Sequence, residues 1–308
     1  MSGAEETLGP TEVVTELRAE APEEAVAIRP LEGVAELEAA ERLQWAVWGE
    51  GAFVVVPTVM LVIGGKAGGA TLGAFTANGR MVGVVSWIPG WSASGRRSQY
   101  SVMLAVDPGY RGGGLGYRLK VAQREHVLAG GVTLINWTFD PLLSLNAHLN
   151  IRKLGCVCNR YLVNYYGEDP ASTARQLPTD RLFVDWRLDD QRVMRRLRGE
   201  GAGAAGAAPH VNTVAIAGRF GFEHNERIEL GLDAPKVLVT IPSSYQAMRR
   251  RDLALALRWR MEIREVFLSY FGRGYEIEGM TVDGPGGGSY VLSRRVGNGN
   301  GRLGEKRI

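Results

Sequence analysis

One glycine-rich stretch, VDPGYRGGGLGYRLK (106–120), has the clearest chemical potential in this sequence. It places five glycines within eight residues, between an apolar run and a basic segment with helical spacing. Glycines at a strand-to-helix turn let backbone N–H groups point into one concavity, because no Cβ atoms block the approach. The positive end of the helix dipole strengthens this effect. The stretch therefore suits a diphosphate, and the alternative is a tight turn that binds nothing.

Two familiar phosphate-binding patterns do not fit these glycines. A dinucleotide fingerprint, Gly-x-Gly-x-x-Gly, counted from Gly112 would need its third glycine at Tyr117. The segment GGKAGG (64–69) has some character of a P-loop, but Ala67 follows Lys66 where Ser or Thr is required. We therefore expect Lys66 to be a loop lysine.

Hydrophobic periodicity predicts the elements that position the stretch. In chain order they are a strand at 25–31, a helix at 37–48, strands at 70–77, 80–89 and 97–106, a helix at 113–129, a strand at 133–139, a helix at 143–154, and strands at 160–166 and 181–188. Asn78-Gly79 between two of the strands predicts a tight hairpin. The apolar window 52–63 is too short to cross a bilayer, so we expect it to be buried core.

A Gly/Ala tract, GEGAGAAGAAP (199–209), separates this region from a second one. There the pattern predicts a strand at 236–242, a long helix that Ser243 and Gln246 open as a capping box, and strands at 275–282 and 289–292. The predicted fold class is α/β (α+β), with a mixed, mostly antiparallel sheet flanked by helices and a smaller C-terminal α+β region. The predicted parts are a flexible arm (1–22), a main domain (23–198), a linker (199–210), an α+β extension (211–295) and a flexible tail (296–308).

Composition narrows the classes of function. A chain of 308 residues with 45% hydrophobic residues can bury a full core. A net charge of +3 is far from the dense positive surface of a nucleic-acid-binding protein, but it permits acidic small molecules as partners. Cys156 and Cys158 are too close in sequence to bridge each other in a strand, which suits a reducing, cytoplasmic location. The sequence shows no secretory signal, and we expect no membrane partner.

The glycines also form an Arg-x-x-Gly-x-Gly pattern directly after a predicted strand. This pattern resembles the acyl-CoA-binding motif of the GNAT superfamily of N-acetyltransferases, whose fold has the strand and helix order predicted above. The resemblance covers about residues 25–188. It implies that the glycine loop binds the pyrophosphate of CoA through its N–H groups, and that the preceding strand pairs with the pantetheine arm. The residues assigned in this way are Met103, Leu104, Ala105, Val106, Arg111, Gly112, Gly113, Gly114, Leu115 and Gly116.

A second part of the family pattern follows at RKLGC (152–156), which resembles the Lys-x-Gly-Phe ending of the next helix. Many family members carry a tyrosine two residues before that lysine, and it protonates the departing CoA thiolate. This chain has Ile151 there. Tyr161, Tyr165 and Tyr166 on the following predicted strand are the substitutes that the sequence offers.

Further resemblances concern the substrates. Asn146 resembles the asparagine that many members place near the pantetheine, although the strict register falls on Ser144. A GNAT subgroup with a C-terminal extension is also similar in four segments, WTFDPLLSLNAHLNIRKLG (137–155), NYYG (164–167), LPTDR (177–181) and ALRWRMEIREVFLSYFGRGY (256–275). Some members of that subgroup are N-succinyltransferases acting on amino acids. The resemblance implies acetyl-CoA or succinyl-CoA as cosubstrate and an amino acid or similar small amine as acceptor.

Three other residue types admit two interpretations each. Asp140, just after a predicted strand, is a candidate acceptor for the amine proton, or it caps the helix that follows. His148 is a candidate base or a surface histidine, and the four histidines of the chain have no metal-binding spacing, so we predict no metal. Cys156 is a candidate nucleophile, but we expect it to be core.

The arginine-rich helix of the extension offers substrate-binding candidates. Its arginines suit a solvated helix face, and the alternative is that Arg260 or Arg264 pairs with a substrate carboxylate through two parallel hydrogen bonds. Arg260 follows Trp259, which the apolar stripe of this helix buries, so we expect Arg260 to lie near the domain junction.

Three hypotheses of different kinds follow. The first is an enzyme that transfers an acyl group from CoA to an amine by direct attack in a ternary complex, with backbone donors near Met103 to Ala105 polarising the carbonyl. The second is an acyl-CoA sensor or scaffold without turnover, which the isoleucine at position 151 motivates. The third is a nucleic-acid-binding module, which the low net charge disfavours. The oligomeric state stays open, with a homodimer as one option.

Overall fold

The structure is a computed structural model of the chain, and it describes residues 25–49, 55–92, 94–167, 177–201, 207–282 and 287–295. The chain divides into two compact units. The first comprises Met1–Pro89 with Ser101–Gly130, and the second comprises Gly90–Tyr100 with Gly131–Ile308. The predicted arm and tail lie outside the described residues, as does part of the predicted linker.

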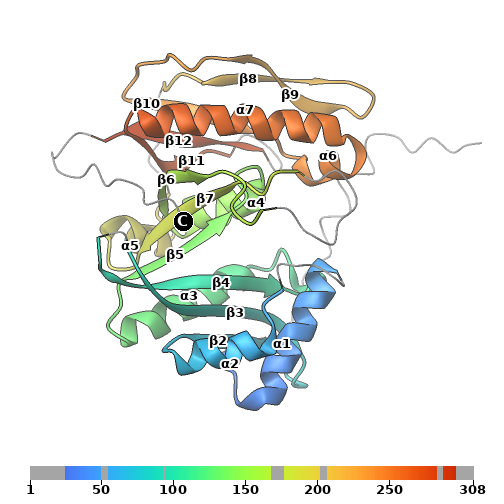
Figure 1. Cartoon of the computed structure of the whole chain (residues 1–308), viewed down its shortest axis with the longest axis vertical. Coiled ribbons are helices and arrows are strands. Elements are labelled where there is room, and N and C mark those ends of the chain that lie inside the picture. Colours follow the sequence, from blue (N-terminus) through green and yellow to red (C-terminus); the bar gives the residue numbers. More distant parts are fainter. Residues whose placement is uncertain are drawn as a thin grey trace, which may run out of the picture. The chain divides into compact units, whose positions relative to one another are not determined.

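The first unit contains a sheet in the order β1-β2-β3-β4 with three helices (Figure 1). Its elements are β1 (Ala27–Pro30), α1 (Gly33–Trp48), α2 (Thr58–Lys66), β2 (Ala70–Phe75), β3 (Met81–Trp91), β4 (Arg97–Val106), the short helix η2 (Pro108–Tyr110) and α3 (Leu115–Ala129). The strands pair antiparallel from β1 to β3. The predicted hairpin at Asn78-Gly79 is confirmed, because the Thr76 N–H donates to the Arg80 carbonyl at 3.0 Å and Gly79 has a φ of +82°.

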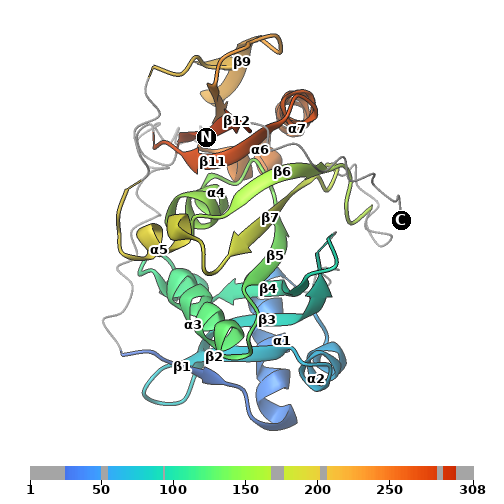
Figure 2. The same ribbon diagram turned by 90° about the vertical axis from the view of Figure 1, so that its left-hand side faces the viewer.

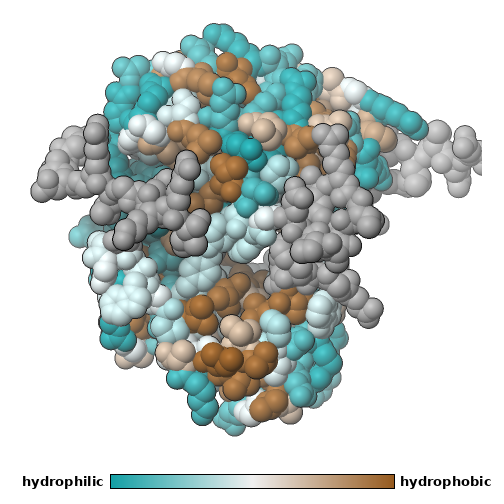
Figure 3. All heavy atoms as spheres, viewed as in Figure 1, coloured by the Kyte–Doolittle hydropathy of each residue, from teal (hydrophilic) through white to brown (hydrophobic). Residues whose placement is uncertain are grey.

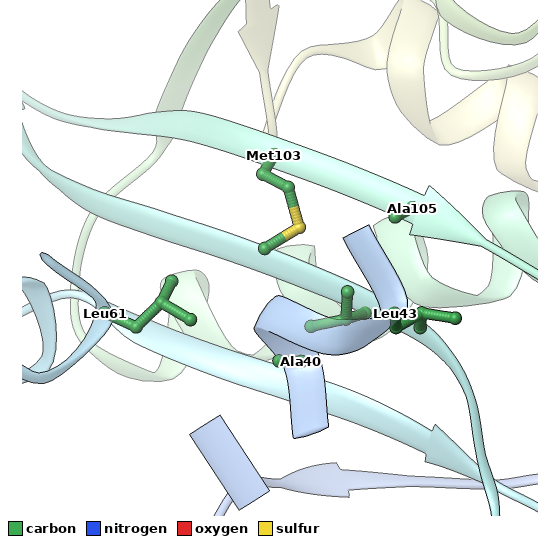
Figure 4. Packing of buried hydrophobic residues seen from close by; sticks show 6 residues of the cluster. Ala40, Leu43, Leu61, Met103 and Ala105 are labelled. Carbon is green, nitrogen blue, oxygen red and sulfur yellow. The ribbon is translucent and has the colours of Figure 1, made fainter. Parts of the chain in front are cut away.

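Side chains on one face of β4 pack into the core of the first unit. Ala40 and Leu43 of α1 and Leu61 of α2 pack with Met103 and Ala105 of β4 in one buried cluster (Figure 4). Alternate residues of a strand point to opposite faces, so Met103 and Ala105 both face these helices. The cluster therefore fixes the strand that leads into the glycine stretch.

The expectation that residues 52–63 form buried core is wrong for the part that the structure describes. Residues from Thr58 onward form α2, in which Leu61 is buried while Val59, Met60 and Ile63 are exposed. Figure 3 shows an apolar patch low on the molecule, in the region where Figure 1 draws α2. An apolar run without polar residues does not reveal which side of a helix faces the core. Lys66 is the last residue of α2 and not a loop residue as predicted.

The second unit contains a sheet in the order β4-β5-β7-β6-β11-β12-β10, and a separate hairpin of β8 and β9. Its elements are β5 (Leu134–Phe139), α4 (Ser144–Ala147), the π-helical turn η3 (His148–Lys153), β6 (Val157–Leu162), β7 (Arg181–Arg187), α5 (Gln191–Leu197), β8 (Asn212–Ala217), β9 (Phe222–Ile228), β10 (Lys236–Ile241), α6 (Tyr245–Arg251), α7 (Leu253–Gly272), β11 (Tyr275–Met280) and β12 (Gly288–Arg294). β5 pairs parallel with the start of β4, and the other pairs of this sheet are antiparallel.

Helix α7 is the central packing element of the second unit. It lies against β6 and β11, and it also packs against the β8–β9 hairpin (Figures 1 and 2). Trp259 donates from its indole nitrogen to the Glu223 carbonyl of β9 at 2.7 Å, and Phe267 stacks on Tyr161 of β6. The sheet and its flanking helices confirm the predicted fold class. Four elements were not predicted, namely α2, α5, β8 and β9.

Two predicted boundaries in this unit are wrong. The strand expected at 160–166 is β6, which ends at Leu162, and the chain then turns at Asn164 with a φ of +46°. The long helix is broken in two, because Asp252 caps α7 by accepting a hydrogen bond from the Leu255 N–H. Ser243 does not cap α6, since its hydroxyl donates to Glu223 instead.

Candidate functional site

The turn between β4 and α3 has the backbone geometry that the glycine pattern predicts. Gly112 and Gly114 have φ angles of +85° and +78°, in the left-handed region that strains other L residues. Apart from the neighbouring residues in the chain, no atom of the described residues lies within 4 Å of the position that a Cβ would occupy at either glycine. The backbone of this turn is therefore open to close approach by a ligand.

Two side chains tie the turn to the end of β4. Asp107 accepts a hydrogen bond from the Gly109 N–H at 2.9 Å and pairs with Arg80 at 2.5 Å. Arg111 donates from Nε to the Val106 carbonyl at 3.2 Å. These contacts fix the direction in which the following N–H groups point, so less ordering entropy is lost when they bind a ligand.

Helix α3 begins at this turn without a side-chain cap, because its N-cap residue is Gly114. The first N–H groups of an α-helix have no acceptor inside the helix, and the helix dipole places partial positive charge there. Arg111 and Arg118, both exposed, add two full charges at the same end of the helix. This combination favours a phosphate group.

The predicted pantetheine strand offers its backbone and not its side chains. Met103 and Ala105 are buried in the core cluster. Leu104 and Val106 are half-buried, and each approaches to 3.9 Å the position that a Cβ would take at Gly116. The side chains of this strand are thus occupied in packing, which leaves main-chain amides as the groups able to bind a ligand.

The segment after β5 places the next predicted residues. Asn146 of α4 is exposed, whereas Ile151 of η3 and Cys156 after it are fully buried. Ile151 is therefore a core residue. Burial and the charges of Lys153 and Arg152 lower the pKa of His148, so this histidine is neutral at physiological pH.

Asp140 follows β5 and is nearly buried. Its Oδ2 accepts a hydrogen bond from Nη2 of Arg260 at 2.5 Å, and its Oδ1 accepts one from the Leu142 N–H at 3.0 Å. Burial lowers the pKa of Arg260, but the charge of Asp140 and the hydrogen bond to it outweigh burial, and the pKa lies above its ordinary value. Arg260 thus holds a carboxylate of the chain itself.

A second buried ion pair lies on α7 one turn further on. Arg264 donates to both carboxylate oxygens of Asp180, and Tyr161 donates its hydroxyl to the same group at 2.8 Å. Burial raises the pKa of Tyr161. Burial also raises the pKa of Asp180. Hydrogen bonds from Arg264, Asn164 and Tyr161 lower this pKa by a larger amount, so the pKa of Asp180 lies below its ordinary value.

Tyr165 is the exposed member of the three predicted catalytic residues. It lies in the turn after β6, where its ring packs edge-on against Tyr166 at 4.8 Å. The Tyr166 hydroxyl is 3.0 Å from Oγ1 of Thr138. Arg181 lies over the Tyr166 ring at 5.1 Å. These hydroxyl groups and the guanidinium of Arg181 form a polar surface beside the end of β5 and the start of β7.

The strand register extends this surface along one face of the second unit's sheet. Tyr100 lies opposite Asn136, Asn136 opposite Asp185, and Thr138 opposite Phe183. Residues opposite each other on neighbouring strands share a face. All except Asn136 are half-buried, so this face combines aromatic rings with polar groups and stays accessible to solvent.

Sequence reasoning missed three residues that the structure singles out. Asp180 and Arg181 lie in the LPTDR segment. The one sequence signal that points to them is a pair of adjacent opposite charges just before a predicted strand. Lys120 of α3 is buried, and its Nζ donates to Ser101 and Gln123 at 3.0 and 2.9 Å. A lysine on the apolar stripe of a helix is the signal that could have found it.

The cysteines and histidines do not form a site in the part of the chain that the structure describes. Cys156 and Cys158 are both buried, and burial raises the pKa of Cys158 to about 12. Among the described residues, no three His, Cys, Asp or Glu side chains are grouped as a metal site would require. None of the described helices combines the length and the apolar character that crossing a membrane requires.

Comparisons with known proteins give similarities of structure only. No protein-family model matches the sequence, and no curated protein matches it. Among solved structures, the chain is similar to the ribosomal-protein-S18-alanine N-acetyltransferase from Escherichia coli, with 20% identity, 53% of this chain and 94% of that chain covered, and a TM-score of 0.42. A putative acetyltransferase from Salmonella typhimurium, solved with its cofactor acetyl-CoA, has 20% identity, coverage of 54% and 95%, and a TM-score of 0.43.

A third similar structure is an acetyltransferase of the GNAT family from Streptococcus pneumoniae, with 19% identity, coverage of 52% and 98%, and a TM-score of 0.42. At these TM-scores the likenesses do not carry a functional argument. Such an argument has to come from the geometry of the chain's own residues.

Proposed function

We propose that this protein is an acyl-CoA-dependent N-acyltransferase. It transfers an acetyl or succinyl group from CoA to the amine of a small molecule, with an amino acid as the preferred acceptor. The single observation that carries the proposal is the turn at Gly112 and Gly114, where left-handed glycines expose backbone at the uncapped start of α3. A diphosphate is the ligand that such a turn binds best.

The first unit supplies the cosubstrate-binding groups under this proposal. The N–H groups from Arg111 to Gly116 bind the pyrophosphate, and the charges of Arg111 and Arg118 add to the attraction. The main chain of Met103 to Val106 binds the amides of the pantetheine arm as a neighbouring strand would. Asn146 is the proposed side-chain partner of that arm.

The proposed reaction needs a base for the amine proton and an acid for the thiolate. The neutral amine attacks the thioester carbonyl carbon, the C–N bond forms, and the C–S bond breaks as the thiolate leaves. Asp140, which accepts a hydrogen bond from Arg260, takes the proton that the amine loses. Tyr165 has the exposed phenol and donates a proton to the thiolate. Tyr161 and Arg264 position Asp180 at this side.

Thermal unfolding with a panel of CoA, acetyl-CoA, succinyl-CoA and longer acyl-CoAs tests the cosubstrate site. A ligand that binds only the folded state raises the melting temperature, by an amount set by its concentration relative to Kd. We expect protection by every CoA species, because the pyrophosphate is common to all of them. No protection by any member of the panel would remove the basis of the proposal.

Release of free thiol in the presence of pools of amines then separates an enzyme from a sensor. Ile151, a buried residue at the position of the family's acid, is the observation that favours a sensor. Thermal protection together with amine-dependent thiol release supports the transferase. Protection without release on any amine would favour the non-catalytic acyl-CoA sensor. Mass spectrometry of the acylated product identifies the acceptor.

A further inference from the structure

Three guanidinium groups and two carboxylates lie close together in the second unit, beside the end of β5 and the start of β7. Asp140 is 2.5 Å from Arg260 and 3.8 Å from Arg181, and Asp180 is 2.8 Å from Arg264. The positive charges of Arg260 and Arg264 also act on each other. Three positive charges against two negative ones leave one positive charge unbalanced within the described part of this cluster.

Two of the three arginines are committed to the chain itself. Arg264 makes a two-pronged pair with Asp180, and Arg260 is buried with its Nη2 on Asp140. Nε and Nη1 of Arg260 are buried and have no hydrogen-bond partner among the described residues. The cluster is therefore short of acceptor oxygens as well as of negative charge. A buried donor without an acceptor is costly, so an additional acceptor stabilises such a cluster.

Arg181 is the arginine through which a ligand can reach the cluster. It is half-buried, its Nη1 donates to the Asp180 carbonyl at 3.0 Å, and its distance of 3.8 Å from Asp140 is too long for a hydrogen bond. Its guanidinium lies over the Tyr166 ring. The exposed Tyr165 and Tyr166 lie beside it. Among the described residues, the guanidinium of Arg181 makes this one hydrogen bond, and an arginine that lies on an aromatic ring with hydroxyls around it has the geometry for a planar anion.

We propose that Arg181 binds a carboxylate of the substrate, with the acceptor amine as its source, so that the acceptor class is α-amino acids and not simple amines. This inference rests on the proposed transferase function and adds the residue that determines specificity. The carboxylate supplies the negative charge that the cluster lacks, and its oxygens accept hydrogen bonds from the guanidinium of Arg181. A succinyl group carries the same chemistry, so the two sources have to be separated by experiment.

The kinetic experiment compares wild type with Arg181→Gln on amino acids and on the matching amines that lack the carboxylate, each with acetyl-CoA and with succinyl-CoA. With acetyl-CoA, we expect Arg181→Gln to lose at least about tenfold in kcat/KM on the amino acid and less than about twofold on the amine, as for a two-pronged ionic contact. A loss confined to succinyl-CoA, on either acceptor, would support a carboxylate site but assign it to the acyl group. Equal losses on all four pairs, or no loss, would overturn the proposal.

Two further variants keep this test independent of folding. Arg181→Lys retains the charge but not the planar fork, and we expect an intermediate loss on amino acids. Arg227→Gln removes an exposed arginine of β9 that pairs with Glu229, and we expect it to behave as wild type. Thermal unfolding of each variant reports whether it is folded. A loss in Arg227→Gln that equals the loss in Arg181→Gln would count against the proposal.

Calorimetry distinguishes a failure of this inference from a failure of the proposed function. Free N-acetyl amino acids and the corresponding N-acetyl amines are titrated into the wild type and into Arg181→Gln, without any acyl-CoA. We expect only the carboxylates to bind, and only to the wild type. Carboxylate binding without thiol release would support the carboxylate site at Arg181 and contradict the proposed transferase function. Thiol release without a preference for carboxylates, in binding or in rate, would support the transferase function and contradict the carboxylate site.

Discussion

Arg264 donates two parallel hydrogen bonds to Asp180, from Nε to Oδ2 and from Nη2 to Oδ1, each at 2.8 Å, and the two residues are 84 positions apart in sequence. The carboxylate is fully buried, and it also accepts hydrogen bonds from the Tyr161 hydroxyl and the Asn164 N–H. This carboxylate therefore joins α7, β6, the turn after β6 and the start of β7. It is the residue whose removal should do most damage to the second unit.

Asp180→Asn should destabilise the protein strongly. The substitution keeps the shape but leaves Arg264 without its counter-charge, and breaking a buried pair from one side costs about 3–5 kcal/mol. Urea denaturation at neutral pH measures the loss. Asp233→Asn is the matched control, because Asp233 also pairs with an arginine, Arg294, but is exposed. We expect that control to leave the free energy of unfolding nearly unchanged, because a solvent-exposed ion pair contributes little, and equal costs for the two variants would contradict this expectation.

The stabilisation by Asp180 should disappear in acid. Its folded-state pKa is lowered below the ordinary value of 3.8, so its contribution is fully present above that pH and is lost as the pH falls through the lower, folded pKa. The difference in unfolding free energy between wild type and Asp180→Asn should therefore be constant from neutral pH down to about 5 and shrink below about 3.8. Denaturation curves across this range measure it. A difference that stays constant into strong acid would refute the assignment.

The glycine turn could be predicted from sequence because everything that defines it is local. Gly112 and Gly114 adopt left-handed angles within one turn, and the strand before them and the helix after them have clear periodicity. The acceptor-side arginines could not be predicted in the same way. Arg260 finds Asp140 across 120 positions, and no local pattern specifies that pairing. Both arginines had a carboxylate as their expected partner, but the carboxylates belong to the chain.

Errors in element boundaries have equally specific causes. The strand that contains Tyr161 ends early because Asn164 accepts a hydrogen bond from the N–H of Thr179, a contact across 15 positions. Tyr165 thus lies in a turn, exposed, and not on the strand. By contrast, the break in the long helix had a local signal, since Asp252 is a good N-cap residue followed by an apolar helical run. The N-cap residue Asp252 therefore predicts this helix start from sequence alone.

Gly112→Ala tests whether the open backbone of the turn binds the ligand. Gly79→Ala is its matched control, because Gly79 has almost the same φ, +82° against +85°, and equally open space for a Cβ. Both should lose about 1–2 kcal/mol of stability from left-handed strain. Only Gly112→Ala should weaken CoA binding, by about tenfold, which corresponds to ~1.4 kcal/mol. Calorimetry with CoA measures the affinities, and an equal affinity in both variants would contradict the proposed site.

Gly116→Glu should separate helix stability from ligand binding. A Cβ at Gly116 meets only Leu104 and Val106 at 3.9 Å, so the side chain fits without strain. A negative charge in the first turn of α3 stabilises the helix by about 0.3–1 kcal/mol, but it repels a pyrophosphate at the same place. The free protein should thus melt at the same or a higher temperature than Gly116→Gln, while its protection by CoA is lost. Protection equal to that of the glutamine variant would exclude the anion site.

Tyr165→Phe should slow acyl transfer without destabilising the protein. Its ring contacts Tyr166 and is exposed, so the phenylalanine packs equally well, whereas a lost general acid costs about 10²-fold in kcat or more. The rate defect of Tyr165→Phe should shrink with an acyl thioester whose thiol has a lower pKa, because such a leaving group needs no proton from the enzyme. A defect of the same size with both thioesters would show that Tyr165 acts by position and not as the acid.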